Sequence, residues 1–159
     1  MARKHLRKSR RSAGGASEKI YRVGRARTGL GLFATAAIRK GVFIVAYHGR
    51  RITHAQAARK EARGARYMFE LNSRWTIDGS SRHNVARYAN HACRPNAESA
   101  LSKGKLILRA IKTIEAGEEI TFDYGQEYFD LFIKPAGCRC DHCRARRPGR
   151  RKTSRRRTS

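Results

Sequence analysis

The sequence predicts one mainly β domain with few short helices, and two observations support this fold class. Short runs rich in apolar and β-branched residues recur through the middle of the chain, and glycine bounds many of them, as is typical of strands. Stretches with helical periodicity are few and short. The expected strands are Ile20–Val23, Leu30–Ala34, Val42–Tyr47, Tyr67–Leu71, Trp75–Ile77, Leu106–Ile111 and Glu119–Phe122.

Three helices are expected among these strands. Thr53 can cap a helix that runs to about Ala62, because the residues between them are mostly helix formers, and Gly64 can end it. Two further segments, Asn84–Ala89 and Glu127–Ile133, are predicted to be short helices.

A short pattern occurs twice in the chain. Ile38-x-x-Gly41-x-x-Ile44 recurs as Ile114-x-x-Gly117-x-x-Ile120, and a strand-like run follows each glycine. Glycine adopts backbone conformations that other residues resist. We therefore expect the same combination of turn and strand at both places, without inferring a gene duplication.

Positive charge is concentrated at the two ends of the chain. The protein has 37 Lys and Arg against 12 Asp and Glu, a formal net charge of +25. Six of these basic residues lie in residues 1–12 and nine in residues 144–159, where no acidic residue occurs. Because large apolar residues are almost absent there, residues 1–19 and 144–159 are expected to be disordered tails. Clustered Arg and Lys favour contact with nucleic acid, although the tails could also serve only solubility.

No apolar run is long enough to span a membrane, and no apolar core of a secretory signal follows the basic start. We therefore expect an intracellular protein without a membrane partner, either cytoplasmic or associated with nucleic acid in a nucleoid or chromatin. An Arg-rich start is also found in mitochondrial transit peptides, but few apolar residues accompany it here. In an intracellular protein, four cysteines bind metal more often than they form disulfides.

Two polar segments in the second half contain most of the side chains suited to chemistry. In Arg87–Asn96, the Asn90 amide and the His91 ring offer both hydrogen-bond donors and acceptors. In Gly117–Gly125, Tyr124 has a hydroxyl that is a poor base at neutral pH but can orient a reacting group.

A glycine-rich segment, Thr28–Ala34, precedes and enters an expected strand. Its Gly-x-Gly pattern is compatible with a tight turn, and no long helix follows, which argues against a dinucleotide-binding loop.

Together these segments, with Tyr47-His48-Gly49, resemble the signature segments of SET-domain protein-lysine methyltransferases. The resemblance covers roughly residues 20–143, of which residues 20–136 would be the SET domain. It implies the SET-domain fold, in which small β-sheets surround a knot-like C-terminal threading. It also implies transfer of a methyl group from S-adenosylmethionine to the side-chain amine of a protein lysine. With the basic tails, it favours a nucleic-acid-associated protein as the substrate.

The resemblance also implies roles for individual residues. Tyr124 would be the catalytic tyrosine, and Tyr47 and Phe122 would line the lysine channel with it, Phe122 tuning how many methyl groups are added. The residues implied to bind the cofactor are Gly29, Leu30, Gly31, Tyr47, Arg87, Tyr88, Asn90, His91 and Tyr124. The insert between Thr53 and Arg74 is short, so the surface available for gripping a peptide is reduced.

The four cysteines resemble the post-SET zinc cluster of the same family. Residues 137–143 contain Cys138-x-Cys140-x-x-Cys143, and Cys93 lies in the Asn-His segment. Four thiolates suit a structural Zn²⁺ ion, which prefers tetrahedral coordination. The second gap is shorter than usual in the family, so His142 is an alternative ligand. A further alternative is that three of the cysteines are reduced surface residues.

Two other function classes remain at this point. A non-catalytic, nucleic-acid-associated protein could retain the SET fold and act through the basic tails. A plain zinc-binding DNA module would leave the glycine and tyrosine segments unexplained. Cofactor binding discriminates the enzyme from both alternatives.

Overall fold

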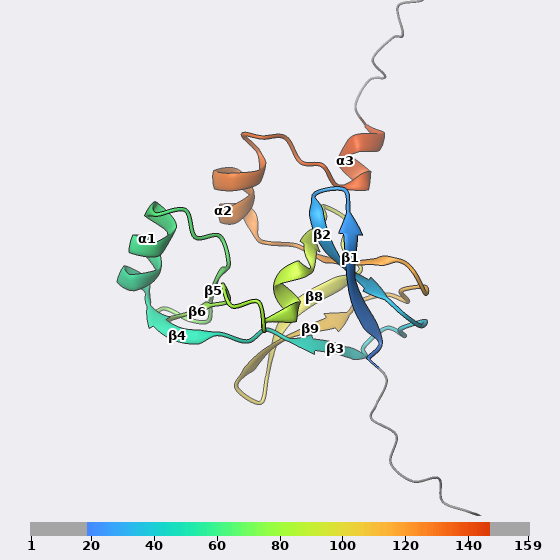
Figure 1. The fold of residues 1–159 in the computed structure, drawn as a ribbon, viewed down its shortest axis with the longest axis horizontal. Helices are drawn as coiled ribbons and strands as arrows, with labels where there is room; N and C mark the ends of the chain where they lie inside the picture. The colour runs from blue at the N-terminus through green and yellow to red at the C-terminus, as the bar shows by residue number, and fades with distance from the viewer. Residues whose placement is uncertain (1–18, 147–159) are drawn as a thin grey trace, which may run out of the picture.

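The structure is a computed structural model, and residues 19–146 of it are described here (Figure 1). The basic tails were expected at residues 1–19 and 144–159, and residues 1–18 and 147–159 of them lie outside the described residues. Of the rest, residues 144 and 145 belong to a short helix, Asp141–Ala145, rather than to a tail.

The described residues form three small sheets, which confirms the mainly β fold class (Figure 1). The first has the order β1-β2-β10-β7, with bounds Tyr21–Ala26, Gly29–Ala34, Glu119–Phe122 and Asn90–His91. The second has the order β3-β9-β8, with bounds Phe43–Ala46, Lys105–Ala110 and Ala97–Ser102. The third has the order β4-β6-β5, with bounds Arg50–Thr53, Trp75–Asp78 and Met68–Glu70.

The helices are short, as the sequence predicts. Helix α1, His54–Ala62, begins with a capping box: the Thr53 hydroxyl accepts from the Gln56 backbone N–H, and the Gln56 side chain accepts from the Thr53 N–H. The other helical segments are the 3₁₀ turn η1 (Val85–Tyr88), α2 (Gln126–Tyr128), its continuation η2 (Phe129–Ile133) and α3 (Asp141–Ala145).

Sequence reasoning missed strands β4, β7 and β8, because tertiary pairing rather than composition forms them. Strand β8 contains no β-branched residue, yet it pairs along its length with β9. The connecting turn, Lys103-Gly104, has positive φ at both residues, which matches the twist of a hairpin. Strand β7 has only two residues, and β10 supplies its partner.

The repeated isoleucine–glycine pattern forms a nearly symmetric junction in the core. Ile38 and Ile114 exchange two backbone hydrogen bonds of 2.8 and 2.9 Å, and both side chains are buried. Gly41 and Gly117 have φ of 86° and 84°, which confirms the expected glycine conformation. The Gly41 N–H donates to the Ala110 carbonyl, which lies in the strand before the second pattern. The Gly117 N–H donates to the Ala34 carbonyl, which lies in the strand before the first pattern. The two turns therefore fix how β3 and β10 enter the core.

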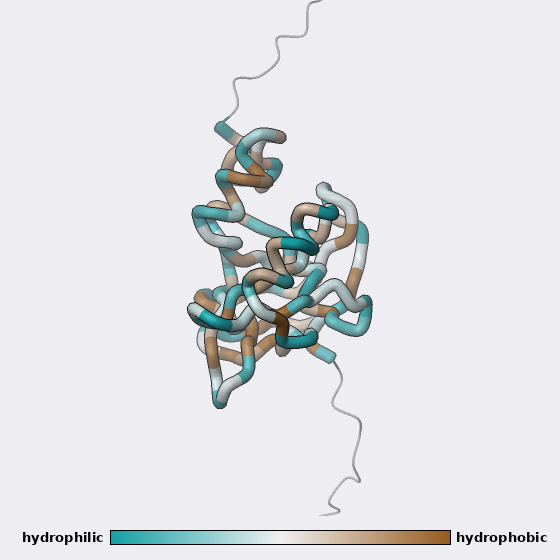
Figure 2. Tube along the Cα trace, turned by 90° about the vertical axis from the view of Figure 1, so that its left-hand side faces the viewer, coloured by the Kyte–Doolittle hydropathy of each residue, from teal (hydrophilic) through white to brown (hydrophobic). Residues whose placement is uncertain are grey.

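Apolar segments are short and alternate with hydrophilic ones along the chain (Figure 2). Among the described residues, no helix is long and apolar enough to cross a membrane.

We expect Gly41→Ala and Gly117→Ala each to lower the free energy of unfolding by about 1 kcal/mol, because alanine is strained at this positive φ. No atom lies within 4 Å of the added Cβ at either position, so a steric clash would not contribute. Urea unfolding measures the change, with Ala37→Gly as a control outside the two turns. Unchanged stability in both glycine variants would show that the turns are not constrained as described.

Candidate active site and metal centre

The parallel pairing of β7 with β10 brings the two polar segments together. Asn90 lies opposite Thr121, and His91 lies opposite Phe122. The buried Asn96 side chain reinforces this pairing, since it accepts from the Thr121 N–H at 2.8 Å and donates to the Glu119 carbonyl at 2.8 Å. Residues 31 positions apart in sequence therefore meet at one site.

Three adjoining cavities share Tyr124 and Tyr128 as wall residues. A cavity of about 510 Å³ lies toward Asn90 and the cysteine segment. A groove of about 480 Å³ lies toward α1 and β5. Between them is a narrow channel of about 70 Å³ with largely aromatic walls. The two tyrosines thus border the cavity, the groove and the narrow channel between the cavity and the groove.

Tyr124 is held in place by its hydroxyl, which donates to the Ala89 carbonyl at 2.8 Å. Its ring lies 4.8 Å from the Phe122 ring and 5.1 Å from the Tyr128 ring. Burial raises the pKa of Tyr124 well above its ordinary value near 10, and the neighbouring tyrosines add to the shift. The hydroxyl therefore stays neutral and still has lone pairs that can accept a hydrogen bond from a ligand.

The other two predicted channel residues also line the narrow passage. Tyr47 is buried; its hydroxyl donates to the Tyr67 carbonyl at 3.1 Å, and its ring packs 5.7 Å from Phe69. Burial is the main cause that raises the pKa of Tyr47, so this phenol also stays neutral. Phe122 is 5% exposed and turns its ring toward Tyr124. The structure therefore brings the three predicted catalytic residues to one channel.

Most, but not all, of the predicted cofactor residues border the larger cavity. Those that line it are Leu30, Arg87, Tyr88, Asn90, His91 and Tyr124. Gly29, Gly31 and Tyr47 do not. A Cβ on Gly31 would lie 2.6 Å from a Glu119 carboxylate oxygen and 2.7 Å from the Ala26 Cβ, so this glycine allows close strand packing.

Asn90 and His91 use most of their polar atoms within the protein. The Asn90 amide donates to the Leu30 carbonyl at 3.0 Å and to Glu119 at 2.7 Å. The His91 Nδ1 accepts from the Tyr124 N–H at 3.3 Å, which leaves the ring proton on Nε2. Burial lowers the pKa of His91, although Asp123 opposes this shift. What remains for a ligand is the Asn90 side-chain oxygen and the backbone of this strand.

Sequence reasoning missed the wall residues Arg66, Tyr67, Tyr128 and Phe132. The Tyr67 ring stacks against the predicted residue Arg87, whose guanidinium lies 3.7 Å from the ring centre and whose Nη1 donates to the Ser80 carbonyl. Arg66 stacks 4.6 Å from the centre of the Phe132 ring. The Tyr128 and Phe132 rings lie 4.8 Å apart. Their spacing of four residues within a helical segment is the signal that could have placed them on one face.

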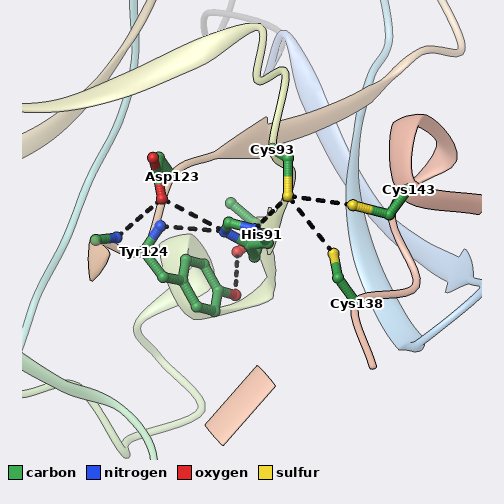
Figure 3. Close-up of polar contacts among 8 residues, drawn as sticks. His91, Cys93, Asp123, Tyr124, Cys138 and Cys143 are labelled. Carbon is green, nitrogen blue, oxygen red and sulfur yellow. Dashed lines mark hydrogen bonds and ion pairs between the residues drawn. The ribbon is translucent and has the colours of Figure 1, made fainter. Parts of the chain in front are cut away.

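The four cysteines form one cluster, and Figure 3 shows three of them, Cys93, Cys138 and Cys143. The four sulfur atoms of Cys93, Cys138, Cys140 and Cys143 lie within 4.8 Å of one another. Cys93 Sγ lies 3.8 Å from that of Cys138 and 3.4 Å from that of Cys143. Sulfurs around a tetrahedral Zn²⁺ with bonds of about 2.3 Å would be about 3.8 Å apart, so the donor set fits zinc. Helix α3 begins directly after Cys140, which allows the short gap to Cys143, and the cluster forms without His142.

The cysteine cluster is connected to the tyrosine through His91 (Figure 3). His91 Nε2 lies 3.4 Å from Cys93 Sγ, and its Nδ1 accepts from the Tyr124 backbone. Burial, followed by the neighbouring thiols, raises the pKa of Cys93. Burial alone would raise the pKa of Cys140. Hydrogen bonds with Cys93, Cys143 and Cys138 outweigh burial, and the net effect lowers this pKa to about 7. Cys93 and Cys140 therefore do not both ionise without a compensating cation.

The SET-domain family model matches residues 29–125, more than half of the chain, so this protein belongs to the SET-domain family. It is 36% identical over 134 residues to the histone-lysine N-methyltransferase mes-4 of Caenorhabditis elegans, covering 71% of this chain and 15% of that protein. It is 34% identical over 125 residues to the histone-lysine N-methyltransferase trithorax of Drosophila virilis, covering 73% and 3% respectively.

Solved structures agree with this assignment. The crystal structure of the Chaetomium thermophilum polycomb repressive complex 2 matches with a TM-score of 0.65 and 31% identity, over 72% of this chain and 16% of that chain. A ctPRC2 structure in an autoinhibited conformation bound to S-adenosylmethionine matches with a TM-score of 0.61 and 31% identity, over 67% and 15%. This chain thus spans a small part of the length of these relatives.

We expect the purified protein to carry about one zinc ion per chain, and Cys93→Ser to loosen it as much as Cys140→Ser does. The sulfur atoms of Cys93 and Cys140 belong to one cluster, although the two residues are 47 positions apart in the sequence. Metal analysis after dialysis against a weak chelator measures retention, with His142→Ala as the matched control that should keep zinc. Full retention by the Cys93 variant would contradict a shared site.

Proposed function

We propose that this protein transfers a methyl group from S-adenosylmethionine to the side-chain amine of a protein lysine. The single observation that carries the proposal is the position of Tyr124. Its hydroxyl is fixed on the Ala89 carbonyl at the boundary between the larger cavity and the narrow channel. A group in the cavity and a side chain in the channel would meet there from opposite sides, as in-line displacement requires.

The larger cavity fits the cofactor in size and chemistry. Its volume of about 510 Å³ lies within the range of small-molecule sites. The Asn90 side-chain oxygen and the backbone around Leu30 and His91 would hold the polar groups, and the Tyr88 ring offers an apolar wall. When bound, S-adenosylmethionine supplies an activated methyl group. The similarity to a structure bound to S-adenosylmethionine supports the same assignment.

The channel suits a lysine that must lose its proton. At pH 7 this loss costs about 4.6 kcal/mol for an unperturbed amine of pKa 10.4. Two guanidinium groups, Arg66 and Arg87, border the channel, and no Asp or Glu side chain lines it among the described residues. Desolvation and nearby positive charge both lower the pKa of a lysine amine. The neutral Tyr124 hydroxyl would accept a hydrogen bond from that amine and align it.

We also propose that the cysteine cluster holds a structural Zn²⁺ that keeps the C-terminal segment against the cofactor cavity. Gly137, Cys138 and Cys140 line that cavity, and Cys93 follows His91 by two residues. In this scheme residues 20–136 form the SET domain and residues 137–143 its metal-binding extension. The names of the relatives make a chromatin protein a reasonable substrate and chromatin a reasonable location.

We expect Tyr124→Phe to reduce kcat about 100-fold while cofactor affinity changes little, because the hydroxyl acts on the reacting groups. Single-turnover methylation and calorimetric titration of S-adenosylmethionine separate the two effects. Tyr21→Phe, in strand β1 and away from the three cavities, is the control. Near-normal turnover in the Tyr124 variant would remove this residue from the catalytic role.

We expect dimethyl- or trimethyl-lysine as the product, and Phe122→Tyr to shift it toward monomethyl-lysine. Each methyl group replaces an N–H donor and adds bulk, so an apolar wall at Phe122 tolerates the growing amine better than a phenol that can fix a water molecule. Intact-mass analysis of a peptide at full turnover measures the product. Exclusively monomethyl product from the unmutated protein would show that Phe122 does not set the outcome.

A further inference from the structure

The groove outside the channel differs in charge from the rest of the protein. Three carboxylates line it, from Glu61, Glu70 and Glu127, and no Lys or Arg does among the described residues. In the whole chain Lys and Arg outnumber Asp and Glu by 37 to 12. A groove of average composition would therefore be basic. Instead, the acidic and basic side chains that line the groove, among the described residues, are these three carboxylates and His54, which is charged only when it is protonated.

These carboxylates are available to a ligand. No ion pair involves the side chain of Glu61, Glu70 or Glu127 within residues 19–146, whereas Asp78, Glu98, Asp130 and Asp141 are all paired with Lys or Arg. Glu70 and Glu127 are exposed, and Glu61 is half-buried at the end of α1. Each of these carboxylates can therefore pair with a cationic group of a ligand in the groove.

The floor and edge of the groove suit an extended polypeptide. Strand β5 lies at one edge of its sheet, and all three of its residues, Met68–Glu70, line the groove. An edge strand presents unpaired backbone groups that another strand can use. Leu131 is 60% exposed and lines the same groove beside Phe132. Apolar surface next to carboxylates accommodates the long stems and charged ends of Arg and Lys.

We propose that this groove selects a target lysine that has arginine or lysine close to it in sequence, through Glu61, Glu70 and Glu127. This inference rests on the proposed methyl transfer and names the substrate class for it. The chain itself supplies sequences of this kind. In residues 1–12 and 144–159 each lysine follows an arginine directly, at Lys4, Lys8 and Lys152.

A peptide of residues 2–12 is the probe, compared with the same peptide in which every arginine is replaced by glutamine. The full-length protein should methylate the arginine peptide with a kcat/KM about tenfold higher at low salt, a difference equivalent to about 1.4 kcal/mol. Raising the salt to about 0.5 M should shrink this preference, because the charges are exposed and screened. Mass analysis of the peptide keeps its methylation separate from that of the protein.

The variant with Glu61→Gln, Glu70→Gln and Glu127→Gln should lose most of the preference and keep its affinity for S-adenosylmethionine, which also shows that it is folded. Glu115→Gln is the matched control, since Glu115 is exposed and lines none of the three cavities. Equal methylation of both peptides by the unmutated protein would overturn the groove inference and leave methyl transfer standing. No transfer to either peptide, or to any other lysine peptide, would instead contradict the proposed function.

Discussion

The two-residue parallel pairing of β7 with β10 is the constraint on which the rest of the site depends. It places His91 opposite Phe122. Strand β10 then leads to Tyr124, and strand β7 leads to Cys93, and His91 contacts both of these residues. So short a ladder has few backbone hydrogen bonds of its own, and the buried Asn96 amide supplements it. Because a buried amide left without partners is costly, this side chain favours a single register. The larger cavity, the channel and the cysteine cluster all border these few residues.

Charge changes sign along the path proposed for the substrate lysine. The groove offers only carboxylates, which attract a protonated amine. The channel offers neutral tyrosines and the stacked guanidinium groups of Arg66 and Arg87, which disfavour the protonated form. In the proposed reaction, different residues would therefore attract the protonated lysine outside and favour its loss of a proton inside. A single acidic channel would bind lysine more tightly but hold it in its unreactive state.

The sequence predicted the parts of the structure in which the local signal and the tertiary role agree. Thr53 was expected to cap α1, and it does so with a complete capping box. The polar segments around Asn90 and Tyr124 were recognisable because their residue types are unusual for strands. Strand β8 could not be found in this way, because it depends on its partner β9. For Tyr128 the only local signal was its helical spacing from Phe132, and nothing in the sequence indicated that its ring would pack against Tyr124.

The repeated isoleucine–glycine pattern connects the core with the channel. Each glycine turn leads into a strand, and each strand ends beside a channel aromatic: β3 directly precedes Tyr47, and β10 ends at Phe122. The Ile38–Ile114 bridge ties the two turns to each other through two backbone hydrogen bonds. The separation of Tyr47 from Phe122 is therefore set by buried backbone pairing rather than by surface loops. An aromatic channel of about 70 Å³ needs such a frame, because a shift of one ångström in either wall would close it or open it to water.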